Sequence, residues 1–151
     1  QANWIYGNCY PAYGLVQTKS DRQGADDELS MYLFEGKFYH EPSVLYRYTL
    51  RLDGFKSYKS TYTPQTVTTK TLTFSGSEMQ VNFKTSAAGS LQIRILDESG
   101  NPIEGYTTEK LIGDNTDRTV SFENDLTALN GQRVKIEFTL SDAELYAFKF
   151  E

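Results

Sequence analysis

The sequence predicts an all-β protein, built as an antiparallel, jelly-roll-like β-sandwich preceded by a partial β segment. Three observations predict this class. From about residue 70 onward, apolar side chains fall on every second position, as half-buried strands require. Gly-containing turns separate these runs, and the longest helical pattern between them is a single turn at residues 125–129. The 11 Tyr and 9 Phe residues, with recurrent Thr, also favour strands over helices.

The clearest alternation lies in two runs, residues 91–95 and 134–140, where apolar residues alternate with Gln, Arg, Lys, Glu and Thr. At the C-terminal end, the same period predicts that Tyr146, Phe148 and Phe150 face inward. Turns are expected at residues 75–76, 97–102 and 130–131, and Asn124 or Asp125 is expected to cap the helical turn.

The upstream residues carry a weaker pattern. Residues 1–28 contain scattered Gly and Pro, which predicts loops with at most one short strand. Residues 29–40 resemble a hairpin with its turn at 35–37. The run 44–53 is predicted as one long strand that ends in a turn at Asp53-Gly54.

These patterns divide the chain into a partial β segment, residues 1–47, and a β-sandwich, residues 48–151. The stretch 46–55 is the seam between them. Because the upstream segment has too few strands to close a core of its own, we expect it to leave apolar side chains such as Met31, Leu33 and Phe34 exposed or packed on a neighbour.

Composition and charge exclude several classes of function. The chain has 15 basic and 20 acidic residues, spread along its length without a basic stripe, so nucleic acid is not an expected partner. No apolar run approaches the roughly 18 residues that would predict a membrane span. Cys9 is the single cysteine and cannot form an internal disulfide; a buried or half-buried thiol is its expected state.

Four segments resemble a known family: YTLRLDGF at 48–55, TTKTLTFSGSEMQVNFKTSAAGSLQIRILDESGNPIEGY at 68–106, LIGDNTDRTVSF at 111–122 and DLTALNGQRVKIEFTLSDAELYAFKF at 125–150. They are similar to the C-terminal β-sandwich of large bacterial proteins in which it follows a five-bladed, glycoside-hydrolase-like β-propeller. WIYGNCYPAYGLV and DDELSMYLFEGKFY, at 4–16 and 26–39, look like the closing part of such a propeller.

The resemblance implies that residues 1–47 are the remnant of the last propeller blade. It also implies an upstream propeller and a polysaccharide or oligosaccharide as partners, and an extracytoplasmic location, either periplasmic or at the cell surface. The expected function is that of a non-catalytic accessory domain that binds glycan weakly or braces the catalytic propeller. Two alternatives stay open: a fragment of a glycoside hydrolase whose active site lies upstream, and a purely structural or protein-interaction sandwich.

Exposed aromatic rings are the expected sugar-binding groups, and Tyr58 and Tyr62 stand outside the clear alternation. Burial of one ring face contributes roughly 2 to 3 kcal/mol of binding free energy, whereas millimolar affinity needs about 4. At least two aromatic platforms and additional hydrogen bonds are therefore required. The other candidates are Tyr106, Trp4, Tyr10, Tyr13 and the single histidine, His40. Packing against a neighbouring segment is the alternative for each.

Two acidic clusters are candidates for chemistry. Residues 26–28 (Asp-Asp-Glu) are the densest run, with a catalytic carboxylate as one interpretation and a solvated loop as the other. Asp114 and Asp117 offer oxygen ligands to Ca²⁺, although four consecutive residues seldom supply the six to eight that it requires, and turn formation is the alternative. No motif predicts another cofactor.

Overall fold

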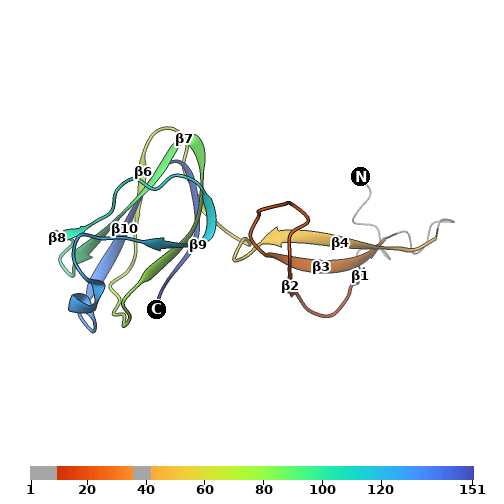
Figure 1. Cartoon of the computed structure of the whole chain (residues 1–151), viewed down its shortest axis with the longest axis horizontal. Coiled ribbons are helices and arrows are strands. Elements are labelled where there is room, and N and C mark those ends of the chain that lie inside the picture. The colour runs from red at the N-terminus through yellow and green to blue at the C-terminus, as the bar shows by residue number, and fades with distance from the viewer. Residues whose placement is uncertain (1–9, 36–41) are drawn as a thin grey trace. The chain divides into compact units, whose positions relative to one another are not determined.

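The computed structural model describes residues 10–35 and 42–151, which divide into two compact units, Gln1–Phe55 and Lys56–Glu151. Strands dominate both units and every strand pair is antiparallel (Figure 1). The all-β, sandwich-type class predicted from the sequence is confirmed. In the described ranges, no helix has the length and apolar character to cross a membrane.

The first unit is a small antiparallel sheet of β1 (Tyr10–Pro11), β2 (Val16–Thr18), β3 (Glu28–Glu35) and β4 (Val44–Arg51). β4 pairs along the whole of β3, from Glu28 opposite Arg51 to Glu35 opposite Val44, while β1 and β2 pair with the two ends of β3. The predicted strand at 44–53 is therefore confirmed as far as Arg51. The predicted hairpin strand at 38–40 lies outside the described residues, and the hairpin partner of β3 is β4.

A turn follows β4. The Gly54 N–H donates to the Arg51 carbonyl oxygen at 2.9 Å, and Asp53 adopts a positive φ of 55°. The seam stretch thus falls within the first compact unit, which ends at Phe55.

The register gives the first sheet one apolar face and one mixed face. Residues opposite one another across β3 and β4 share a face, and faces alternate along each strand. The apolar face carries seven apolar residues, Leu29, Met31, Leu33, Val44, Tyr46, Tyr48 and Leu50, and at its ends Glu35 opposite Val44 and Gln17 opposite Leu29. None of these side chains is buried, and Ser30, on the other face, is the one buried residue among those of this unit whose burial is described.

The second unit contains β5 (Tyr58–Lys59), β6 (Gln65–Thr68), β7 (Met79–Asp97), β8 (Pro102–Thr107), β9 (Asp114–Val120), the 3₁₀ helix η1 (Leu126–Leu129) and β10 (Val134–Phe150). The two long strands, β7 and β10, pair along their lengths. Their outer edges are extended by β8 and β9 on β7, and by β5 and β6 on β10.

Both long strands change register at their middle, where Ser141 and Ala143 of β10 are separated by the positive-φ residue Asp142 and pair with Ser90 and Thr85. The halves on either side form two layers around one core. One layer is β6, the first half of β10, the second half of β7, and β8; the other is β5, the second half of β10, the first half of β7, and β9. The core residues include Met79, Val81, Phe83, Leu91, Ile93, Ile95, Val134, Ile136, Phe138, Leu140, Ala143 and Leu145.

The prediction for the final strand needs one correction. Ala143 and Leu145 are buried, whereas Tyr146 is only half-buried and sits in a register shift between Leu145 and Ala147. Because the bulge adds one residue, the alternation of inward and outward side chains shifts by one position. Phe148 and Phe150 therefore face the core as predicted, and Tyr146 does not.

The predicted helical turn is confirmed as η1, and Asp125 is its cap. The Asp125 carboxylate accepts a hydrogen bond from the Thr127 N–H at 2.9 Å, which lowers the pKa of this carboxyl group.

Candidate functional site

A cleft opens at the edge of β10, because two separate short strands cover that edge. β6 pairs with residues 137–140 of β10, and β5 pairs with Glu144 and Leu145. Where the chain passes from one to the other, it leaves a hollow between β5 and β6, which we call the β5–β6 cleft. The cleft has two compartments that share Tyr58 and Val67 as lining residues.

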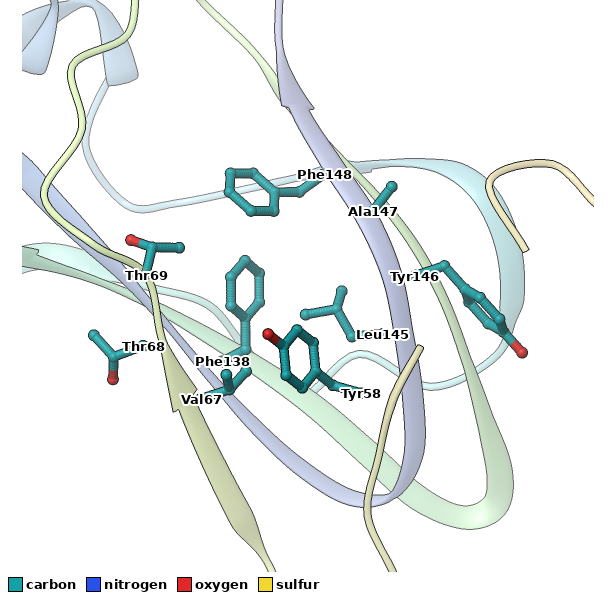
Figure 2. Close-up of a pocket in the computed structure, with 9 residues that line it drawn as sticks. All are labelled: Tyr58, Val67, Thr68, Thr69, Phe138, Leu145, Tyr146, Ala147 and Phe148. Atoms are coloured by element: carbon teal, nitrogen blue, oxygen red, sulfur yellow. The ribbon is translucent and has the colours of Figure 1, made fainter. Parts of the chain in front are cut away.

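The apolar compartment has a volume of about 320 Å³ and is lined by residues 58, 67–69, 138 and 145–148. Its floor is formed by core side chains. Phe138 and Leu145 are buried, and the Phe138 and Phe148 rings pack with centroids 5.1 Å apart. Figure 2 shows the Tyr58 ring beside Phe138 and Val67, with Phe148 beyond them, while the Tyr146 ring lies on the other side of the β10 ribbon.

The second compartment has a volume of about 280 Å³ and is lined by residues 58–60, 65–67 and 140. Its surface is also mostly apolar, and the polar side chains at it are those of Lys59, Ser60, Gln65 and Thr66. The cleft therefore offers a largely apolar surface with a few hydrogen-bonding side chains at one end, a combination typical of small-molecule sites.

Glu144 fixes the chain that carries Tyr58. Its carboxylate pairs with the Lys59 Nζ at 2.9 Å and accepts hydrogen bonds from the Tyr146 hydroxyl at 2.7 Å and the Ser57 hydroxyl at 3.3 Å. The hydrogen bond from Lys59 is the main reason that the pKa of Glu144 is lowered, and the same bond raises the pKa of Lys59. Both groups are therefore held in their charged forms beside the cleft.

The two leading sugar-binding candidates are both exposed, Tyr58 by 65% and Tyr62 by 74%. The intervening Ser60 is buried and its N–H donates to the Ala143 carbonyl oxygen, while the Tyr62 carbonyl oxygen accepts from the Ser141 hydroxyl. Residues 58–61 thus run antiparallel along β10, and the chain bends at Tyr62.

Tyr106 must be removed from the candidates. It is 4% exposed, its ring packs in the core near Phe122, and its hydroxyl donates to the Asp125 carbonyl oxygen at 2.9 Å. Because it lies on β8 with its side chain inward, it has no free face for a sugar.

The remaining aromatic candidates lie in or near the first unit. Tyr13 is fully exposed and lines a hollow of about 460 Å³ with its loop neighbours and Met31. Tyr10 lies in β1, where it pairs with Phe34. Trp4, His40 and Cys9 lie outside the described residues.

The acidic run at 26–28 is used in structural contacts. Asp27 pairs with the Lys19 Nζ at 2.7 Å and accepts from Gln17, and the hydrogen bond from Lys19 is the main cause that lowers its pKa. Glu28 accepts from the Arg47 Nη2 at 2.7 Å.

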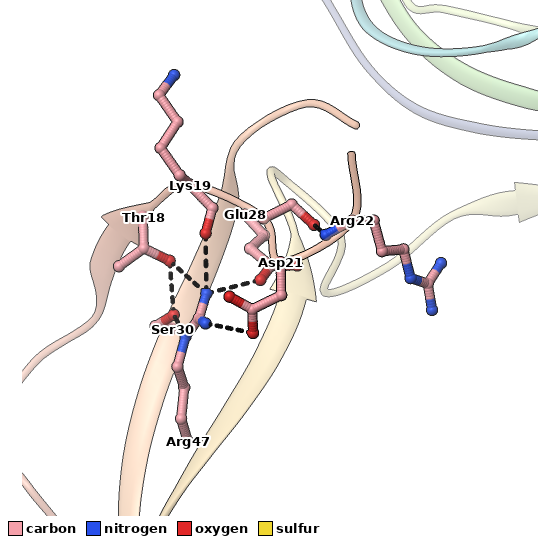
Figure 3. A network of polar contacts seen from close by, with 8 residues as sticks. Thr18, Lys19, Asp21, Arg22, Glu28, Ser30 and Arg47 are labelled. Atoms are coloured by element: carbon pink, nitrogen blue, oxygen red, sulfur yellow. Dashed lines mark hydrogen bonds and ion pairs between the residues drawn. The ribbon is translucent and has the colours of Figure 1, made fainter. Parts of the chain in front are cut away.

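Arg47 is the centre of a polar network on the mixed face of the first sheet (Figure 3). Its guanidinium donates to the buried Ser30 hydroxyl at 2.8 Å, to Thr18 at 2.9 Å and to the Lys19 carbonyl oxygen at 3.0 Å, besides pairing with Asp21 and Glu28. These contacts join β2, β3, β4 and the loop after β2. With its donors so occupied, Arg47 is a brace of the sheet rather than a ligand-binding group.

The Ca²⁺ interpretation of Asp114 and Asp117 is not supported. Both residues lie within β9 rather than in a turn, and Asp114 pairs with the Lys84 Nζ at 3.6 Å. Over residues 10–35 and 42–151, no group of three or more His, Cys, Asp or Glu side chains is placed to hold a metal ion.

Sequence reasoning found Tyr58 but missed the other walls of the cleft. Phe148 is distant in sequence from Tyr58, and the pairing of both β5 and β6 with β10 brings Val67, Thr68 and Phe148 to that ring. No family model matches the chain, and comparison with curated proteins and with solved structures yields no match.

Proposed function

We propose that the chain is a non-catalytic accessory domain of an extracytoplasmic, carbohydrate-active protein, and that its second unit binds glycan in the β5–β6 cleft. The observation that carries the proposal is the place of Tyr58. Its exposed ring lines both compartments of the cleft, between the apolar floor of the first and the side chains of Gln65 and Thr66 in the second. A pyranose ring has an apolar C–H face and polar hydroxyl groups, so it needs both kinds of surface at one place.

The energetics require more than one ring. A single tyrosine face contributes roughly 2 to 3 kcal/mol, against about 4 for millimolar affinity. The cleft supplies the difference through the side chains of Gln65, Thr66 and Lys59, and Tyr62 supplies a second ring along the same segment. We therefore expect millimolar to high micromolar binding that extends over more than one sugar unit.

The contacts of the acidic residues support binding rather than hydrolysis. A glycosidase needs two carboxyl groups facing one bond, about 5 to 9.5 Å apart. In the described part of the chain, Asp27, Glu28 and Glu144 each pair with a Lys or Arg side chain.

Calorimetric titration with a panel of plant and host polysaccharides tests the proposal. Tyr58→Ala should weaken binding by at least about tenfold, and Tyr62→Ala should weaken it for longer oligosaccharides more than for short ones. The matched control is Ile112→Ala, which removes an exposed apolar side chain on the β8–β9 connection and should leave affinity unchanged. Absence of binding to every polysaccharide at millimolar concentration would contradict the proposal.

A second candidate function, bracing of a neighbouring propeller, is favoured by the apolar face of the first unit. A single sheet with one apolar face must bury that face on a second layer, and sheets pack about 10 Å apart with interleaved side chains. Seven apolar residues occupy this face along β3 and β4, as on the inner face of a sandwich, and Glu35, opposite Val44, interrupts them at one end. We propose a propeller blade as the sheet that covers it.

Hydroxyl-radical footprinting tests this second function. Val44, Tyr46 and Tyr48 should be labelled in this chain and protected in a longer protein that joins it to the proposed propeller. The exposed Tyr62 serves as the internal control, with equal labelling in both proteins. Equal labelling of the three face residues would exclude the bracing contact.

A further inference from the structure

The apolar compartment of the β5–β6 cleft carries no charged side chain in its lining. Charged residues adjoin the lining, and two of them are paired with other residues: Glu144 with Lys59 at 2.9 Å, and Glu137, which lies opposite Thr68, with Arg94 at 3.4 Å. The polar atoms of the lining are hydroxyl groups of threonine and tyrosine. One of them, that of Tyr146, already donates to Glu144.

This composition limits what can enter. A carboxylate placed against Phe138, Leu145 and Phe148 would lose its water without gaining a cation, which is costly. A primary hydroxyl group would lose part of its hydration on entering the compartment. In return it could form a hydrogen bond with at most one of the threonine hydroxyls. A methyl group would gain from burial on the same floor.

Resting on the proposed glycan function, we infer that the apolar compartment selects neutral sugars with a methyl group at C6, that is, 6-deoxyhexoses. In this arrangement the Tyr58 ring packs on the sugar face, the C6 methyl lies on the floor formed by Phe138, Leu145 and Phe148, and the ring hydroxyls face Gln65 and Thr66. The compartment, at about 320 Å³, is at the lower limit of small-molecule pockets, as suits a single sugar unit.

Three methyl glycosides that differ only at C6 test the inference on the full chain: CH₃ (6-deoxyhexoside), CH₂OH (hexoside) and COO⁻ (uronoside). Each is made in the gluco, galacto and manno series, and affinity is measured by NMR titration. In the series that binds, the 6-deoxyhexoside should bind about fourfold tighter than the hexoside, the ratio expected for one buried methyl group of about 0.8 kcal/mol. The uronoside should bind at least about tenfold more weakly than the hexoside.

A gain-of-function variant makes the test independent of loss of folding. Thr68 is exposed at the rim of the apolar compartment and lies opposite Glu137, so Thr68→Lys is made in a Glu137→Gln background, which keeps the added cation from pairing with that carboxylate. It should raise uronoside affinity at least about fivefold relative to the hexoside and lower the preference for the 6-deoxyhexoside. Thr107→Lys, at an exposed threonine of β8, is the matched control and should change neither ratio.

The outcomes separate the two proposals. Binding of the hexoside without a preference for the 6-deoxyhexoside, or a uronoside that binds as tightly, overturns the inference and leaves the glycan function standing. If neither the methyl glycosides nor the polysaccharides bind, the glycan function itself is overturned. Tighter binding of the 6-deoxyhexoside that Thr68→Lys reduces and Thr107→Lys does not would establish the compartment as the C6 subsite.

Discussion

The backbone of Gly89 lies directly against the backbone of Asp142, at the place where β7 and β10 change register. A Cβ on Gly89 would lie 2.8 Å from the Ser141 carbonyl oxygen and closer still to that of Asp142. The bend that turns one pair of long strands into two layers therefore depends on the absence of a side chain at residue 89.

Gly89→Ala should lower the free energy of unfolding of the second unit by about 1 to 3 kcal/mol, because the added methyl group forces the two strands apart. Urea denaturation measures the change. Ala88→Ser, at the exposed neighbouring residue, should stay within about 0.5 kcal/mol of the wild type. If Gly89→Ala were as stable as the wild type, the bend would tolerate a wider separation of β7 and β10.

Much of this fold could be predicted from the sequence, because strands with one buried face have apolar residues at every second position. The runs 91–95 and 134–140 were predicted correctly for that reason. The bulge at Tyr146 could not be predicted, since it is set by the partner strand and not by the local pattern. Tyr106 follows a Gly-rich turn and looks free in sequence, yet the long-range packing of β8 buries it.

The candidate site, too, could be predicted only in part, because it depends on pairing between distant segments. Tyr58 was predicted as a sugar-binding residue because it lies outside the alternation of apolar and polar residues. The exposure of its side chain agrees with that reasoning. The cleft itself depends on two short strands attached to β10 eighty or so residues later in the chain. A tertiary pairing of this kind has no local signature, so Val67 and Phe148 could not be assigned to the site.

Arg47→Met should lower the free energy of local unfolding of the first sheet by about 1 to 3 kcal/mol, because Ser30 and Glu28 lose their charged donor in a partly buried place. Hydrogen exchange at the β3 and β4 amides measures this opening. Arg47→Lys should recover only part of the loss, since an ammonium group cannot reach the same set of acceptors. Arg22→Met, at an exposed loop residue, is the control, and equal exchange in both Met variants would contradict the bracing role.

Tyr106→Phe should cost about 0.5 to 1.5 kcal/mol of stability in the second unit, because the hydrogen bond to the Asp125 carbonyl oxygen is lost while the ring stays in the core. Thermal and urea unfolding measure the loss. Glycan affinity should not change. A weakened affinity at unchanged stability would return Tyr106 to the binding residues.

Glu144→Gln should destabilise the second unit only above acidic pH, by about 0.2 to 1 kcal/mol at pH 7, the range for an exposed ion pair. The pKa of Glu144 is lowered by the hydrogen bond from Lys59, so its contribution is present above the ordinary value of 4.5 and is lost as the pH falls through the lowered pKa. The stabilities of wild type and variant should therefore converge as the pH falls through this lowered pKa. Urea titrations from pH 3 to pH 8 measure this, with Glu109→Gln, an exposed residue, as the control. Because the same carboxylate holds Lys59 and Ser57 beside Tyr58, a difference that persists unchanged at pH 3 would mean that Glu144 stabilises this edge through packing rather than through its charge.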